Sequence, residues 1–207
     1  MLYNSDYERR IYMPPKAKIT KEMIVDAAFE IVREEGVDKV TARRISEQLK
    51  CSTQPVLYYF PTVEEIKKMV YAKSDEYHAI YLMSGEMDYG NPILTMGMNY
   101  IRFAIEERNL FRFLFQTNEL SGVSLLDLLE SEELLPMLTV LQNELNMSME
   151  DTKDVFSTLF IFIHGYASLY ANNTMVYDET NVMKALEKIF EGAVCATKGE
   201  KKYEKDK

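Results

Sequence analysis

The sequence predicts an all-α fold made of a small N-terminal helical domain and a larger helical C-terminal domain. Apolar residues recur at helical spacing through most of the 207 residues, and this spacing lets a helix bury one face. The chain has 8 glycines and 6 prolines, and several of them fall where one periodic segment ends and the next begins. Charge also divides the chain: residues 13–73 carry 11 Lys or Arg against 9 Asp or Glu, whereas residues 74–207 carry 11 against 22.

The distribution of charge is more informative than the net charge of −9, which by itself disfavours a nucleic-acid partner. A near-neutral to basic first part on an acidic second part is typical of a nucleic-acid-binding module joined to a part that does not contact nucleic acid. Ordinary variation of surface charge is the alternative explanation.

Composition and cysteine usage indicate a cytoplasmic protein. Cys51 and Cys195 lie far apart without metal-ligand spacing, which favours a reducing compartment over a disulfide scaffold. The N-terminal residues lack the apolar core of a signal peptide. The longest nearly apolar run, residues 159–171, is too short to span a bilayer. We therefore expect no membrane segment.

The first helix is predicted over residues 20–35, after a flexible N-terminal arm at residues 1–18. Its apolar residues Ile24, Ala27, Ala28, Ile31 and Val32 form one stripe. Thr20 is suited to cap its N-terminus, and Gly36 tolerates the positive φ common after a helix C-terminus.

Two short helices are predicted next, at residues 41–49 and 52–60, with Lys50 and Cys51 in the turn. Thr41 and Ser52 are the expected N-caps, and Pro55 falls in a first turn, where the missing N–H has no intrahelical role. Val56, Leu57 and Phe60 are expected to point inward. The outer face of the second short helix then carries Thr53, Gln54, Tyr58 and Tyr59.

Two short helices joined by a tight turn can place the second one in a DNA major groove. Gln54 can read an adenine edge, and Thr53 can contact a base edge or a thymine methyl. Phosphate contacts are expected from Thr41, Arg43, Arg44, Ser52 and the hydroxyls of Tyr58 and Tyr59. The spacing alone leaves an ordinary helical hairpin, with the tyrosines in its core, as the alternative.

Residues 19–66 resemble the N-terminal domain of the tetracycline-repressor (TetR) family. The resemblance is carried by the first helix with Gly36, by Thr41, Arg43 and Ile45, and by Ser52 and the Tyr58–Phe60 triplet. It implies a three-helix helix-turn-helix DNA-binding domain at 19–66 and a helical ligand-binding and dimerisation domain at 67–197. Pro55, which fixes the start of the second short helix, is counted with the expected DNA-binding residues.

Two positions depart from the family pattern. Lys50 stands where the family usually has glycine, so either Lys50 adopts an unfavourable backbone conformation or the turn differs. Val63 stands where the family usually has a phosphate-binding lysine, and Lys67 and Lys68 are the nearby basic residues.

A helix at 62–83 is predicted to lead from the first domain into the second. Further helices are predicted at 92–107, 110–116, 123–145 (broken near Pro136), 149–172 and 179–197, followed by a disordered tail at 198–207. The 149–172 helix is apolar nearly all round and must be covered on several faces. Two-fold packing of 149–172 and 179–197 against a second copy would form a four-helix bundle, and the resemblance implies the same homodimer. A monomeric core is the alternative.

A small-molecule pocket in this domain is predicted only from the resemblance. The residues alone do not predict it, because aromatic and Met side chains at helical spacing suit a plain apolar core equally. Its lining would suit an apolar or aromatic effector. The candidate pocket residues are Asn99, Arg102, Phe103, Phe111, Gln116 and His164. His164 is also explained as a buried histidine bonded to a neighbour, and Gly165 as a site of close helix packing. Glu106 and Glu107 resemble a solvated face.

Catalytic and metal-binding patterns do not occur in the sequence. There is no phosphate-binding glycine loop, no nucleophile motif, and no His or Cys partner at ligand spacing from His78. We expect no enzyme activity, no cofactor and no metal. The sequence thus predicts a homodimeric transcriptional regulator. It is expected to bind double-stranded operator DNA as a repressor, and a small ligand is expected to relieve the repression. A helical adaptor that binds another protein without specific DNA binding is the alternative.

Overall fold

The computed structural model describes residues 19–83, 89–117, 127, 129–132 and 134–199, and every regular element within them is a helix. The predicted arm at 1–18, part of the segment between the predicted helices at 62–83 and 92–107, and most of the predicted tail lie outside these residues. The α-helices are α1 (Lys21–Glu35), α2 (Ala42–Gln48), α3 (Gln54–Tyr59), α4 (Val63–Met83), α5 (Pro92–Glu106), α6 (Arg108–Phe115), α8 (Leu135–Leu145), α9 (Met149–Asn172) and α10 (Glu179–Thr197). A 3-10 turn, η1 (Val37–Lys39), joins α1 to α2.

Helices α1–α3, here called the head (residues 19–60), are bounded by local capping interactions. Thr20 Oγ1 accepts a hydrogen bond from the Met23 N–H at 3.2 Å, and Thr41 Oγ1 accepts one from the Arg44 N–H at 3.1 Å. Gly36 ends α1 with φ of 93°, a conformation that glycine adopts without strain. Head residues with fully or almost fully buried side chains form its apolar core: Ile24, Ala28, Ile31, Val32, Ile45, Val56 and Phe60.

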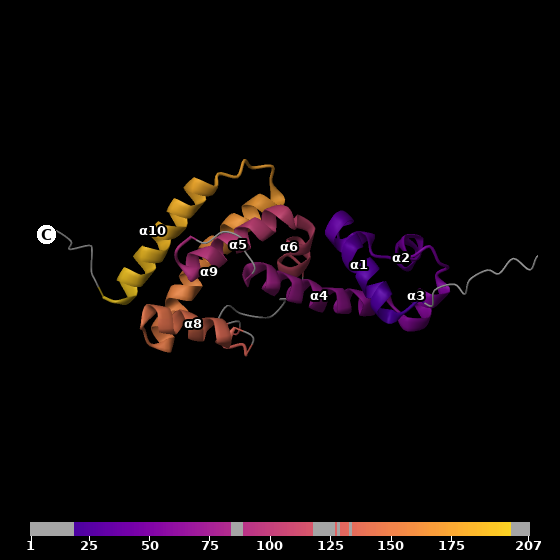
Figure 1. Cartoon of the computed structure of the whole chain (residues 1–207), viewed down its shortest axis with the longest axis horizontal. Helices are drawn as coiled ribbons and strands as arrows, with labels where there is room; N and C mark the ends of the chain where they lie inside the picture. Colours follow the sequence, from indigo (N-terminus) through magenta and orange to yellow (C-terminus); the bar gives the residue numbers. More distant parts are fainter. Residues whose placement is uncertain (1–18, 84–88, 118–126, 128, 133, 200–207) are drawn as a thin grey trace, which may run out of the picture.

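Helix α4 connects the head to the remaining helices, α5–α10, here called the body (residues 89–199). Its 21 residues span about 30 Å at 1.5 Å per residue. Thr62 accepts a hydrogen bond from the Glu65 N–H at 3.3 Å, which caps its first turn. The head lies at one end of an elongated molecule, and α8 and α10 lie toward the opposite end (Figure 1).

The body is organised around the contact of α5 with α9, and α10 packs against both. Gly97 of α5 makes this close packing possible, since a Cβ there would lie 2.8 Å from Ile163 Cδ1 and 3.0 Å from Leu186 Cδ2. The prediction that Gly165 serves close packing is wrong, because a Cβ at Gly165 would meet no atom within 4 Å.

Most predicted helix bounds are confirmed, with two corrections. The break predicted near Pro136 in the 123–145 helix is observed slightly earlier in the chain: the described residues 130–132 and 134 are not helical, and α8 begins at Leu135. Pro136 occupies the first turn of α8, where a proline starts a helix instead of breaking one. Glu107 is the single residue between α5 and α6, so the predicted helices at 92–107 and 110–116 are almost contiguous.

Within the described residues, none of the helices is long and apolar enough to cross a membrane. The same residues hold no group of three or more His, Cys, Asp or Glu placed to bind a metal ion.

Candidate nucleic-acid interface

The turn between α2 and α3 is tight because Lys50 adopts a left-handed conformation. Its φ is 53°, and the Lys50 N–H donates to the Glu47 carbonyl at 3.2 Å. The Cys51 N–H then donates to the Ser46 carbonyl at 3.0 Å. Of the two expectations for a lysine in place of the family's glycine, the strained conformation is the one observed.

Helix α3 is anchored by Val56 and Phe60, which are 0% and 2% exposed. Pro55 lies in its first turn, as predicted. The expectation that Ser52 caps this helix is wrong: the N-cap residue is Thr53, and its side chain makes no capping hydrogen bond. Ser52 and Thr53 are both exposed, so these hydroxyls face solvent at the start of α3.

The outer face of α3 is exposed, and one of its members was not predicted. Gln54 is exposed and Tyr58 is 81% exposed, whereas Tyr59 is half-buried with its ring 5.2 Å from that of Tyr58. Leu57 was expected to point inward but is 52% exposed. We name Ser52, Thr53, Gln54, Leu57 and Tyr58 the α3 face; α3 lies at the end of the molecule remote from α10 (Figure 1).

The polar residues predicted on α2 are already engaged within the head. Thr41 caps α2 through its hydroxyl. The Arg43 side chain is 87% exposed and pairs with Glu47 at 3.0 Å, whereas the half-buried Arg44 pairs with Glu35 at 2.5 Å. Arg43 is thus the more accessible of the two cations.

The first turns of α4 lack a basic residue at the position where the family usually has one. Val63 is half-buried and packs against the apolar core. Lys67 is half-buried and Lys68 is exposed on the same helix. Lys68 is therefore the more accessible cation of the two.

The six predicted pocket residues do not share one environment. Some lie among buried aromatic rings, and others make separate polar contacts. Phe103 and Phe111 are fully buried, and Phe111 lies 5.7 Å from the half-buried ring of His164. The buried Asn99 donates to the Leu82 carbonyl at 3.0 Å, and Arg102 pairs with Glu179 at 3.6 Å. Gln116 is exposed after the end of α6. A ligand site among these six residues stays a prediction.

Two histidines pack among aromatic rings in the body and α4. We call this group the aromatic cluster; it comprises His78, Tyr100, Phe103, Phe111, Phe115, Phe160 and His164. Burial lowers the pKa of His78 to about 4 and also lowers the pKa of His164. His164 Nδ1 lies 2.9 Å from the Tyr100 hydroxyl, as expected for a histidine bonded to a neighbour. Among the described residues, His78 Nε2 is buried without a hydrogen-bond partner.

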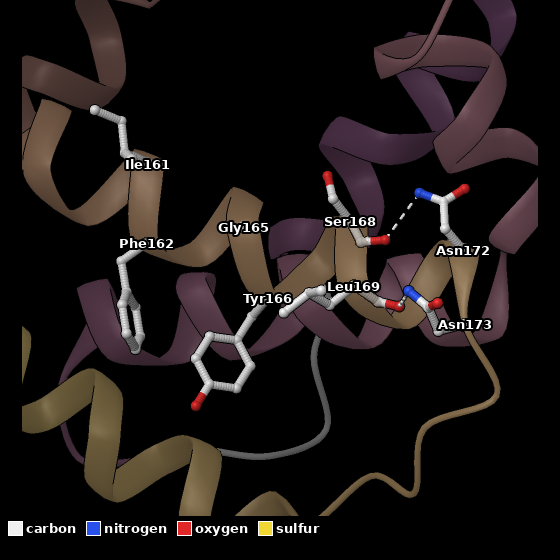
Figure 2. Close-up of a pocket in the computed structure, with 8 residues that line it drawn as sticks. All are labelled: Ile161, Phe162, Gly165, Tyr166, Ser168, Leu169, Asn172 and Asn173. Atoms are coloured by element: carbon white, nitrogen blue, oxygen red, sulfur yellow. Dashed lines mark hydrogen bonds between the residues drawn. The ribbon is translucent and has the colours of Figure 1, made fainter.

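An open depression lies along α9, the helix predicted to be apolar nearly all round (Figure 2). Ile161 and Leu169 on this helix are 61% and 49% exposed, so the described chain leaves part of its apolar surface uncovered. In contrast, α10 buries Val182 and Leu186 within the body. The depression is lined by Ile161, Phe162, Gly165, Tyr166, Ser168, Leu169, Asn172 and Asn173.

Comparison with known proteins adds no family assignment: no family model and no curated protein matches this chain. The resemblance to the TetR family therefore rests on the residues within 19–66 quoted above.

Proposed function

We propose that this protein is a sequence-specific DNA-binding transcriptional regulator that acts as a homodimer and whose DNA binding is relieved by a small molecule. The observation that carries the proposal is the α3 face, which presents hydroxyls, an amide, an apolar side chain and a phenol at one end of the molecule. The buried Val56 and Phe60 hold α3 so that this face stays outward.

The side chains on the α3 face suit the edges and backbone of a major groove. The Gln54 amide matches adenine N6 and N7, and the exposed Leu57 offers an apolar contact to a thymine methyl. The hydroxyls of Ser52, Thr53 and Tyr58 can bind phosphates and fix the register of the head on the duplex. Arg43, which is 87% exposed and paired with Glu47, adds an accessible guanidinium in α2 of the head.

A homodimer is proposed because one α3 face reads only half of a palindromic site. Two heads in successive major grooves require half-sites about 34 Å apart, held at that spacing by the body. The exposed apolar side chains Ile161 and Leu169 of α9 support a two-fold contact along this helix. An apolar or aromatic effector that binds more tightly to a dimer with another head spacing would shift the protein from the DNA-bound to the free state.

A double variant tests the proposed reading face. Gln54→Ala with Tyr58→Ala removes two exposed side chains, so we expect folding to be retained and specific binding to be lost. Fluorescence anisotropy with DNA from upstream of the gene measures binding, and Ile80→Ala, an exposed α4 residue that is 59% accessible, is the matched control. Unchanged affinity of the double variant for the specific DNA would refute the proposed role of α3.

The second candidate function is a helical adaptor, and the exposed pair Leu57 and Tyr58 also suits a protein partner. Salt dependence separates the two functions. A DNA-binding protein that neutralises several phosphates loses affinity steeply as salt rises. The slope of the logarithm of the binding constant against the logarithm of the salt concentration is about −0.9 per phosphate contact. Absence of any salt-dependent DNA binding would favour the adaptor.

A further inference from the structure

The joint between α5 and α6 is one residue, Glu107, whose backbone makes a hydrogen bond to each helix. Its N–H donates to the Phe103 carbonyl in α5 at 2.8 Å, and its carbonyl accepts from the Phe111 N–H in α6 at 2.9 Å. A rotation of α6 against α5 therefore moves Glu107 and its side chain.

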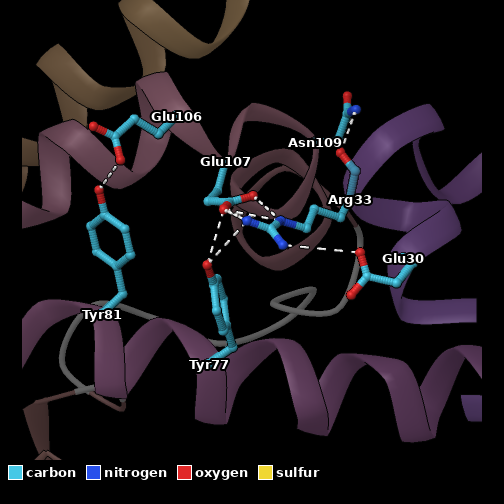
Figure 3. Close-up of polar contacts among 7 residues, drawn as sticks. All are labelled: Glu30, Arg33, Tyr77, Tyr81, Glu106, Glu107 and Asn109. Atoms are coloured by element: carbon cyan, nitrogen blue, oxygen red, sulfur yellow. Dashed lines mark hydrogen bonds and ion pairs between the residues drawn. The ribbon is translucent and has the colours of Figure 1, made fainter. Parts of the chain in front are cut away.

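The side chain of Glu107 ties this joint to the head. It was expected on a solvated face, but the residue is only 7% exposed. Arg33, in the last turn of α1, donates through Nε to both carboxylate oxygens at 3.0 and 2.8 Å and through Nη2 to Oε1 at 2.5 Å. Tyr77 of α4 donates its hydroxyl to Oε1 at 3.0 Å (Figure 3). One buried carboxylate thus joins α1, α4 and the α5–α6 joint.

Neighbouring groups hold Arg33 in place for this contact. Asn109 Nδ2 in α6 donates to the Arg33 carbonyl at 3.0 Å. The Arg33 guanidinium lies over the Tyr77 ring, 5.6 Å from its centroid, and Phe29 of α1 meets the same ring edge-on at 5.6 Å. A bidentate arginine–carboxylate pair fixes orientation as well as distance, which a single hydrogen bond or an apolar contact does not.

The adjacent carboxylate, Glu106, provides a natural comparison. It is exposed, and it accepts a hydrogen bond at 2.6 Å from Tyr81, one helical turn after Tyr77 on α4. Figure 3 shows the two tyrosine–glutamate pairs side by side along α4. The Tyr81–Glu106 bond joins α4 to α5, whereas the contacts of Glu107 also reach α1.

We propose that Arg33, Glu107 and Tyr77 form a latch that fixes the orientation of the head on the body. A buried carboxylate needs its partners, so the contact is either closed on Arg33 or broken and hydrated. Because Glu107 is also the α5–α6 joint, a movement of α6 that breaks the pair releases α1. The effect of the latch on operator binding rests on the proposed function, whereas its effect on head orientation does not.

Glu107→Gln and Glu106→Gln are the matched pair that tests the latch. Both replace a carboxylate that accepts from a tyrosine of α4, but only the first weakens the tie to α1. Spin labels at Lys39→Cys in the head and Lys188→Cys in the body, with Cys51 and Cys195 replaced by serine, report head orientation as a distance distribution. Dilution with unlabelled full-length protein restricts the signal to distances within one chain.

The latch predicts a broader head-to-body distribution in Glu107→Gln and an unchanged one in Glu106→Gln. Equal widths for Glu107→Gln and the parent protein, or equal broadening in both variants, would overturn it. If Glu107→Gln does not fold, Arg33→Lys keeps the charge but loses the bidentate geometry, and broadening is expected there too. An unbroadened Arg33→Lys would equally overturn the latch.

Operator affinity is a separate readout. Where the parent protein binds its operator specifically, Glu107→Gln should change that affinity about 5-fold or more, the size of a typical coupling between sites. Absence of specific binding by the parent protein refutes the proposed function and leaves the distance test of the latch intact.

Discussion

Replacement of Lys50 by glycine is expected to stabilise the protein, although a glycine substitution usually does the reverse. Lys50 has φ of 53°, in the left-handed region that costs a residue with a Cβ about 1–2 kcal/mol. Glycine removes this strain but adds about 0.5–1 kcal/mol of backbone entropy to the unfolded chain. The midpoints of these two ranges leave a net gain of about 0.75 kcal/mol, or about 1.5–3 °C in Tm for a chain of this size.

Two control variants isolate the backbone effect. Lys50→Ala removes the same exposed side chain but keeps the left-handed strain, so its stability should stay near that of the parent. Lys68→Gly makes the same exchange at an exposed position inside α4, where glycine destabilises a helix by about 0.5–1 kcal/mol. Urea unfolding at neutral pH gives the three free energies. If Lys50→Gly were no more stable than Lys50→Ala, the strain assigned to this turn would be refuted.

Three further outcomes can be measured on the body. Gly192→Ala, with open space around it, should raise stability by about 1 kcal/mol in calorimetry through its higher helix propensity. Gly97→Ala should gain less than Gly192→Ala, because its Cβ would displace the side-chain ends of Ile163 and Leu186. The pKa of His78 is near 4 in the folded protein and near 6.5 in the unfolded chain. Between these two pH values only the unfolded chain binds the proton, so the unfolding free energy falls by about 3 kcal/mol as the pH drops from 6.5 to 4. His78→Phe should remove this pH dependence from a titration of the unfolding free energy. If the proposed homodimer forms along α9, Ile161→Glu should reduce the mass in light scattering from that of two chains to that of one chain of 24.1 kDa. An unchanged mass of two chains would place the contact elsewhere.

Helix ends were predictable from the sequence because capping is local. The predicted N-caps Thr20 and Thr41 each accept a hydrogen bond from an N–H three residues later, whereas the predicted cap Ser52 was wrong by one residue. The predicted ranges 149–172 and 179–197 coincide with α9 and α10. Residue type and spacing suffice for such features, since both partners lie within one helical turn.

Features that depend on distant partners were missed. Glu107 looked solvated because its neighbour is also acidic, and its burial depends on Arg33, 74 residues earlier. Gly165 and Gly97 cannot be told apart by position in a helix, and only the structure shows which one faces a neighbouring helix. The outward orientation of Leu57 was missed because α3 has six residues, too few for apolar periodicity to define a face.

The central claim, specific operator binding through α3, is tested most directly by footprinting the purified full-length protein on DNA from upstream of its gene. The account predicts two protected half-sites about one helical turn apart, with protection that weakens steeply as salt rises. In the Gln54→Ala, Tyr58→Ala variant this protection should disappear while Ile80→Ala retains it. Protection that is absent, or that is the same on unrelated DNA and in the double variant, would contradict the account.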